Sequence, residues 1–182
     1  MPSSTRPRSK YNSLPHGAPT AAQRSATELF CVAVKHHLAD ELDAAEKGYR
    51  GVIALEPKFA EALNNLGVLV RPRDAQAAHA FFERAVAARP RYAEAQFNLA
   101  LSHMVAGKLL EAANGFRTVI DIDGNSGRAW NELGSCLRGL GELDAALEAS
   151  RRAVTLLPND AATHNNLGNV LLQTGRLDAA RV

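Results

Sequence analysis

The sequence predicts an all-α fold, an α-solenoid of antiparallel helix pairs. Three observations favour it. From residue 26 onward the chain repeats itself with a period of about 34 residues. Each repeat places a small residue in the middle of its first helix, where a neighbouring helix can approach closely. Only 5% of the residues are aromatic, and alanine and leucine, both strong helix formers, are abundant.

The first 25 residues differ from the rest of the chain. Pro2, Pro7, Pro15 and Pro19 interrupt any helix, and Ser, Arg and Gly fill the intervals. We therefore expect residues 1–25 to form a disordered basic tail. An organelle transit peptide is the alternative, although the prolines count against the amphipathic helix of a mitochondrial signal.

Two units follow the tail. The first, 26–59, is a weak copy of the pattern, with Leu29, Ala33, Ala45, Tyr49 and Pro57. The second, 60–92, has Leu63, Gly67, Ala78, Phe82 and Pro90 in the same order, and is one residue short at the turn 71–74. Proline cannot continue a helix beyond its first turn, so each proline indicates the end of a second helix.

The next units keep the register. The third, 93–126, carries Leu99, Ala100, Ala112, Phe116 and Gly124. The fourth, 127–160, is the clearest, with Trp130, Leu133, Gly134, Ala146 and Pro158. The fifth, 161–182, is partial and carries His164, Leu167, Gly168 and Ala180. Gly107, Gly141 and Gly175 fall at the turns between the paired helices, where a positive φ is expected.

The spacing of Trp130, Leu133, Gly134, Ala146 and Pro158 resembles the tetratricopeptide repeat (TPR). This resemblance implies a right-handed superhelix whose concave groove, lined mostly by the first helix of each unit, binds a peptide or a partner helix. The expected groove residues are Phe30, Val34, Asn64, Asn65, Phe97, Asn98, Leu101, Arg128, Asn131, Glu132, Asn165, Asn166 and Asn169.

Asparagine recurs at one helical position, as Asn65, Asn98 and Asn166, and Glu132 interrupts the series. A carboxamide offers a donor and an acceptor, so such a ladder could hold the backbone of an extended peptide. The alternative is that these side chains solvate the groove wall or bond neighbouring helices.

Asn-Asn-Leu-Gly at 64–67 and His-Asn-Asn-Leu-Gly-Asn at 164–169 are similar to the TPR arm of O-linked N-acetylglucosamine transferases and their bacterial relatives. The resemblance implies a second hypothesis, that the chain is a substrate-presenting arm continued by a C-terminal glycosyltransferase domain. The first hypothesis is a protein-interaction scaffold.

Composition and motifs exclude other classes. Apart from four basic residues near the N-terminus, the chain has 17 basic and 19 acidic side chains, which disfavours nucleic acid as a partner. Cys31 and Cys136 have no metal or disulfide spacing, and no catalytic or phosphate-binding motif occurs. No apolar run could span a membrane. We expect a cytoplasmic protein that is not an enzyme and needs no metal or cofactor.

Overall fold

The computed structural model describes residues 20–175. Residues 1–19 of the tail expected at 1–25, and residues 176–182 of the partial fifth unit, lie outside the described residues. Within them the chain forms nine α-helices and no strand. Their bounds are α1 Ala21–Leu38, α2 Leu42–Leu55, α3 Ala60–Val70, α4 Ala75–Ala88, α5 Ala93–Val105, α6 Leu109–Ile122, α7 Gly127–Gly139, α8 Leu143–Leu156 and α9 Ala161–Gln173.

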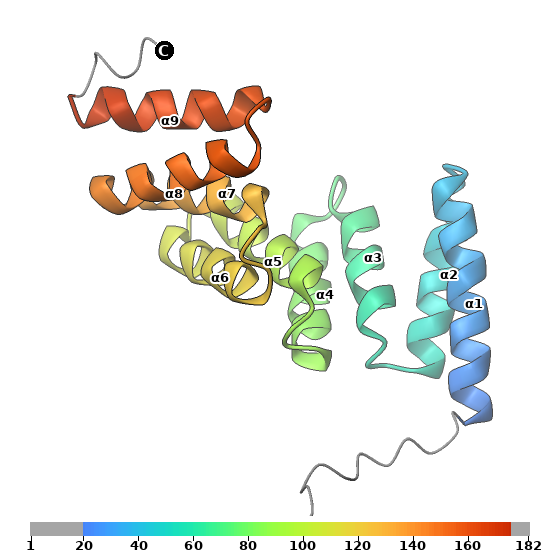
Figure 1. Ribbon diagram of the computed structural model, residues 1–182. Helices are drawn as coiled ribbons and strands as arrows, with labels where there is room; N and C mark the ends of the chain where they lie inside the picture. Colours follow the sequence, from blue (N-terminus) through green and yellow to red (C-terminus); the bar gives the residue numbers. More distant parts are fainter. Residues whose placement is uncertain (1–19, 176–182) are drawn as a thin grey trace, which may run out of the picture.

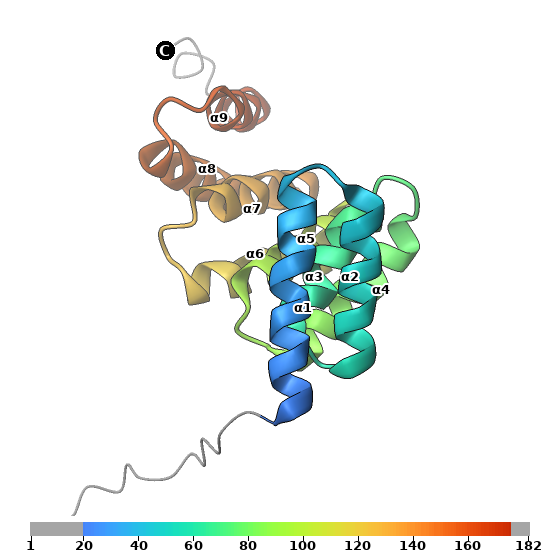
Figure 2. The ribbon, with the colours of Figure 1, turned by 90° about the vertical axis from the view of Figure 1, so that its right-hand side faces the viewer.

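The helices stack in sequence order as antiparallel pairs (Figures 1 and 2), which confirms the all-α solenoid. The first helix begins at Ala21, inside the segment expected to be a tail. Thr20 explains this start, because its hydroxyl accepts from the backbone of Gln23 and the Gln23 side chain accepts from the backbone of Thr20. This reciprocal capping box stabilises the extra turns of helix, and Ala26 is already fully buried.

The odd-numbered helices lie on the inside of the curve. α3 packs directly on α5 and α7 on α9, whereas no two even-numbered helices make a comparable contact in the described part of the chain. Elements on the inside of a bend are closer together than those on the outside. The first helix of each pair therefore forms the concave face.

Small residues allow the two helices of each pair to approach. A Cβ added at Gly67 would lie 2.6 Å from Cε1 of the buried Phe82. In the first pair the order is reversed, and a Cβ at Gly48 of α2 would lie 2.5 Å from Cβ of Ala33. A small residue at each of these two crossings therefore lets the paired helices approach closely.

The turns after α5, α7 and α9 use a positive φ, as expected for Gly107, Gly141 and Gly175, with values of 74°, 82° and 72°. The first pair uses Asp40 with a φ of 59° at the corresponding place. Aspartate is one of the few other residues that tolerate this conformation.

A recurrent side-chain bond closes the junction between successive pairs. In three units the side chain of the fourth residue of the first helix bonds the backbone carbonyl of the residue six positions earlier. The pairs are Gln96 with Pro90 at 2.9 Å, Trp130 with Gly124 at 3.0 Å and His164 with Pro158 at 2.8 Å. His164 and Trp130 therefore have a structural role at the loop between repeats.

Candidate functional site

The predicted groove residues lie on the odd-numbered helices, and they differ greatly in exposure. Asn64 has no exposed surface, and Asn131 and Asn98 are 7% and 9% exposed. Arg128 and Asn165 are exposed, and the remaining members of the set are half-buried. The concave face thus presents some of these side chains directly and buries others between adjacent repeats.

A hydrogen-bond relay joins the first three pairs. Asn98 Nδ2 donates to Asn64 Oδ1 at 2.9 Å, and Asn64 Nδ2 donates to Asn65 Oδ1 at 3.3 Å. Asn65 Nδ2 donates to the Tyr49 hydroxyl at 3.4 Å, which lies 3.0 Å from Nδ1 of His37. The relay therefore connects α5, α3, α2 and α1.

A second relay joins the last two first helices. Asn166 Nδ2 of α9 donates to Asn131 Oδ1 of α7 at 2.8 Å, and Asn131 Nδ2 donates to Glu132 Oε1 at 3.2 Å. In both relays the later repeat donates to the earlier one. The asparagines thus bond neighbouring helices, one of the two roles that the sequence left open.

Each relay leaves one carboxamide oxygen uncommitted. Oδ1 of Asn98 and Oδ1 of Asn166 have no partner among the described residues. The buried side-chain polar atoms without a partner in the described residues are His103 Nδ1 and Ser150 Oγ. The two asparagine oxygens are therefore not fully buried and reach the surface of the concave face. A carboxamide oxygen in this position can accept a hydrogen bond from a ligand.

An aromatic and cationic contact replaces the amide pair at the middle junction. Phe97 occupies the position in α5 that Asn64 holds in α3 and Asn131 holds in α7. Glu132 of α7 occupies the position of the donors Asn98 and Asn166. The guanidinium of Arg128 lies over the Phe97 ring, 4.7 Å from its centre. Phe97 also packs edge-on against Phe116 at 5.4 Å. The concave face therefore has an aromatic ring and charged groups at this junction, where the other two have paired amides.

The first pair contributes an apolar end to the concave face. Phe30 is half-buried, with ring centres 5.0 Å from Phe59 and 5.9 Å from Tyr49. Val34 packs against the same core. Leu101, at the other apolar position of the predicted set, is half-buried against the core of α5 to α9.

The repeat pattern predicts Tyr49 only as a residue that fills the space between repeats. Phe82 and Phe116 occupy the same place in the next two units, so the additional hydroxyl was the available signal. A buried phenol needs a hydrogen-bond partner, and burial raises the pKa of Tyr49. Asn65 and His37 supply the partners.

The described residues contain no cluster of three or more side chains suited to hold a metal ion. Burial, with a smaller contribution from the nearby Glu132, raises the pKa of the Cys136 thiol to about 11, so this thiol is protonated at neutral pH. None of the helices in residues 20–175 combines the length and apolarity that a bilayer crossing needs.

The comparisons with known proteins agree with this architecture. A family model described as "Tetratricopeptide repeat" matches residues 69–126, and a model described as "TPR repeat" matches 134–175, together more than half of the chain. The fold is that of a helical-repeat protein with a concave face formed by its first helices. The chain belongs to the tetratricopeptide repeat family.

Solved structures show the same fold. MamA from Desulfovibrio magneticus RS-1 superposes with a TM-score of 0.78 at 20% identity, over 88% of this chain and 92% of that one. A second MamA structure gives 0.76 at 21% identity over 86% of each chain. YrrB, described as a TPR protein with an unusual peptide-binding site, gives 0.74 at 20% identity over 88% and 87%. No curated protein sequence matched the chain.

Proposed function

We propose that this protein is a non-catalytic interaction scaffold that binds an extended peptide or a partner helix along its concave face. One observation carries the proposal: two carboxamide oxygens, on Asn98 and Asn166, remain uncommitted on the inner surface although their own amide groups are fixed by buried neighbours. Acceptors that are oriented before the ligand arrives lose little entropy on binding.

The neighbouring side chains suit the same role. Arg128 is exposed beside the half-buried Phe97, and Asn165 is exposed on α9. A peptide lying across α5, α7 and α9 would meet acceptors, a cation and an aromatic ring in succession. The peptide-binding site named for YrrB supports a peptide ligand for this fold, and the two unpaired cysteines favour a reducing compartment such as the cytoplasm.

The test is a selection of random displayed peptides on the whole chain, followed by calorimetry with the peptides recovered. Replacing Arg128 and Asn165 by Ala should weaken binding by roughly fivefold or more, a loss of about 1 kcal/mol. The matched control replaces Arg152 and Asn114, exposed on α8 and α6, by Ala. Weakening by the control pair alone would contradict the proposal.

The alternative, a substrate-presenting arm of a glycosyltransferase, would use the same concave face. The reading frame distinguishes the two hypotheses. A nucleotide-sugar-binding α/β domain encoded downstream of Val182 would support the arm, and a stop codon there would support the scaffold.

A further inference from the structure

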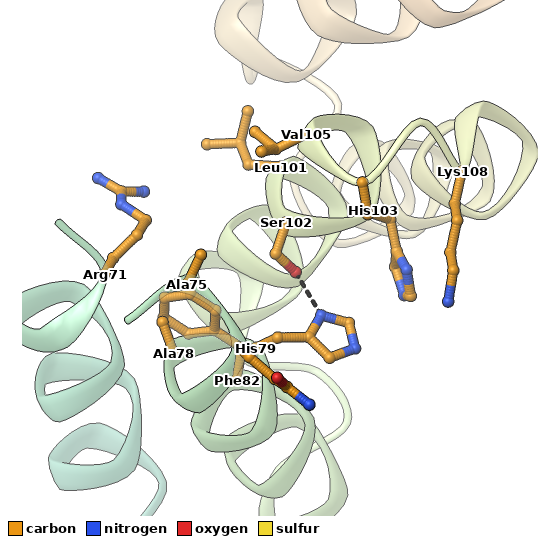
Figure 3. Close-up of a pocket in the computed structure, with 12 residues that line it drawn as sticks. Arg71, Ala75, Ala78, His79, Phe82, Leu101, Ser102, His103, Val105 and Lys108 are labelled. Atoms are coloured by element: carbon orange, nitrogen blue, oxygen red, sulfur yellow. Dashed lines mark hydrogen bonds between the residues drawn. The ribbon is translucent and has the colours of Figure 1, made fainter. Parts of the chain in front are cut away.

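A pocket of about 590 Å³ lies between the second and third repeats. It is bounded by Arg71 after α3, by the N-terminal half of α4 and by the C-terminal half of α5, with Lys108 beyond it (Figure 3). The repeat pattern assigns Ala78 and Phe82 to helix packing, and of the lining residues only Leu101 belongs to the predicted groove set. The two amide relays do not reach this pocket.

The pocket has a cause in the sequence. α3 contains 11 residues, whereas α5, α7 and α9 each contain 13. Each helical residue adds about 1.5 Å, so the last turn of α5 has no residue of α3 beside it. Val105 in that turn is 81% exposed. The repeat that is one residue short thus leaves a space at its own turn.

The residue equivalent to His79 is buried in the other described repeats, whereas His79 itself is half-buried. The place of His79 on α4 is held by Glu46 on α2, which forms ion pairs with Arg50 and with Arg73 of the following repeat. On α6 it is held by Ala113, which is fully buried, and on α8 by the buried Leu147. His79 is therefore more accessible than its counterparts on α2, α6 and α8.

The lining combines an apolar floor with a basic rim. Ala78, Phe82, Leu101 and Val105 supply apolar surface. Arg71 and Lys108 stand at its edges, His79 and His103 line it as well, and no acidic residue does. This combination suits an apolar group that is flanked by negative charge.

The two histidines of the lining contact each other, and His79 also bonds Ser102. His79 Nδ1 lies 2.7 Å from the Ser102 hydroxyl, which itself donates to the Leu99 carbonyl at 2.7 Å, so His79 is the donor (Figure 3). Nε2 of His79 lies 3.4 Å from Oε1 of Glu83, a residue that does not line the pocket. The His103 ring packs edge-on against His79 at 4.9 Å, and its buried Nδ1 has no partner among the described residues. Burial, His79 and Lys108 lower the pKa of His103, so Arg71 and Lys108 supply the positive charge.

We propose that this pocket binds one apolar side chain of a partner peptide whose adjacent residues are aspartate or glutamate. The apolar side chain would contact Phe82, Leu101 and Val105, and the carboxylates would pair with Arg71 and Lys108. The chain's own N-terminal segment does not match, because Arg6, Arg8 and Lys10 would be repelled by the same rim.

The probe is a fluorescein-labelled peptide, Glu-Glu-Asp-Leu-Phe-Asp-Glu-Glu, titrated against the whole chain by fluorescence anisotropy. Arg71→Glu combined with Lys108→Glu should weaken binding by roughly tenfold or more. The matched control, Arg151→Glu with Arg152→Glu, makes the same change in net charge on exposed residues of α8 and should change affinity by less than about twofold. Replacing Leu-Phe in the probe by Ser-Ser should abolish binding.

Amide chemical shifts provide the location. Binding at the pocket should perturb the amides of Leu101, Ser102 and Val105 more than those of α7 and α9. Absence of binding, equal weakening by both charge-reversal pairs, or shifts confined to α7 and α9 would overturn the proposal. Dimerisation of the chain that the Arg71 and Lys108 variant abolishes would also overturn it, because a second copy would then occupy the pocket.

Discussion

The side-chain amide of Asn98 donates a 2.9 Å hydrogen bond to Oδ1 of Asn64, a residue of the preceding repeat that has no exposed surface. Two first helices are thereby held in a defined offset by polar groups that are largely shielded from water. The stability of this junction therefore depends on both partners being present.

Asn64→Ala should lower the free energy of unfolding by about 1–3 kcal/mol, because it leaves the Asn98 amide and Asn65 Oδ1 without their partner. The Asn64→Ala, Asn98→Ala double variant should cost less than the sum of the single variants. Urea unfolding followed by circular dichroism measures the cycle. Asn165→Ala, at an exposed position, is the control and should change stability by less than about 0.5 kcal/mol. Strict additivity in the cycle would show that the pair does not interact.

Ser150→Ala should stabilise the protein. The Ser150 hydroxyl is buried beside Gly134 and has no hydrogen-bond partner among the described residues. Removing a buried polar group that is desolvated and unpaired should raise the free energy of unfolding by about 1 kcal/mol. Ser102→Ala is the contrasting variant, because that hydroxyl bonds both Leu99 and His79, and it should be destabilising. The idea fails if thermal unfolding shows a lower Tm for Ser150→Ala.

Glu46→Gln should destabilise the protein at neutral pH and much less in acid. Hydrogen bonds from Arg73 and Arg50 hold the pKa of Glu46 below its ordinary value of 4.5, although burial opposes them. A carboxylate with a lowered folded pKa contributes stability above its unfolded pKa, and that contribution is lost as the pH falls through the folded pKa.

The measurement is urea unfolding of the wild type and the Glu46→Gln variant at pH 7 and at pH 3. The difference between the two proteins should be largest at pH 7 and should shrink at pH 3. A difference that is the same at both pH values would indicate that the substitution acts through packing alone. Glu148→Gln, on an exposed position of α8, controls for the loss of one surface carboxylate.

Trp130→Phe should cost about 1 kcal/mol, because it removes the indole N–H that bonds the Gly124 carbonyl while keeping an aromatic ring. Trp130→Ala should cost more, but less than the roughly 3–5 kcal/mol of a fully buried tryptophan, because this side chain is half-buried. Chemical unfolding of both variants compares the two contributions. Equal stability of Trp130→Phe and the wild type would remove the role assigned to this bond.

Local patterns were enough to predict the helix pairs. The small residues at Ala33, Gly67, Ala100 and Gly134, and the turn glycines, act within a repeat or between adjacent helices, so their spacing along the chain determines the register. The start of α1 was predicted five residues too late. The prolines of the tail all precede Thr20, and the capping box of Thr20 and Gln23 allows the helix to begin directly after them.

The sequence by itself determined that this protein is a stack of helix pairs, because each pair is built from contacts between residues close together in the chain. Only the tertiary structure decided which asparagine bonds which, and that a pocket opens between α3 and the end of α5. Both depend on the offset between first helices of successive repeats. That offset results from the packing of whole helices about 34 residues apart, and no short segment of sequence specifies it.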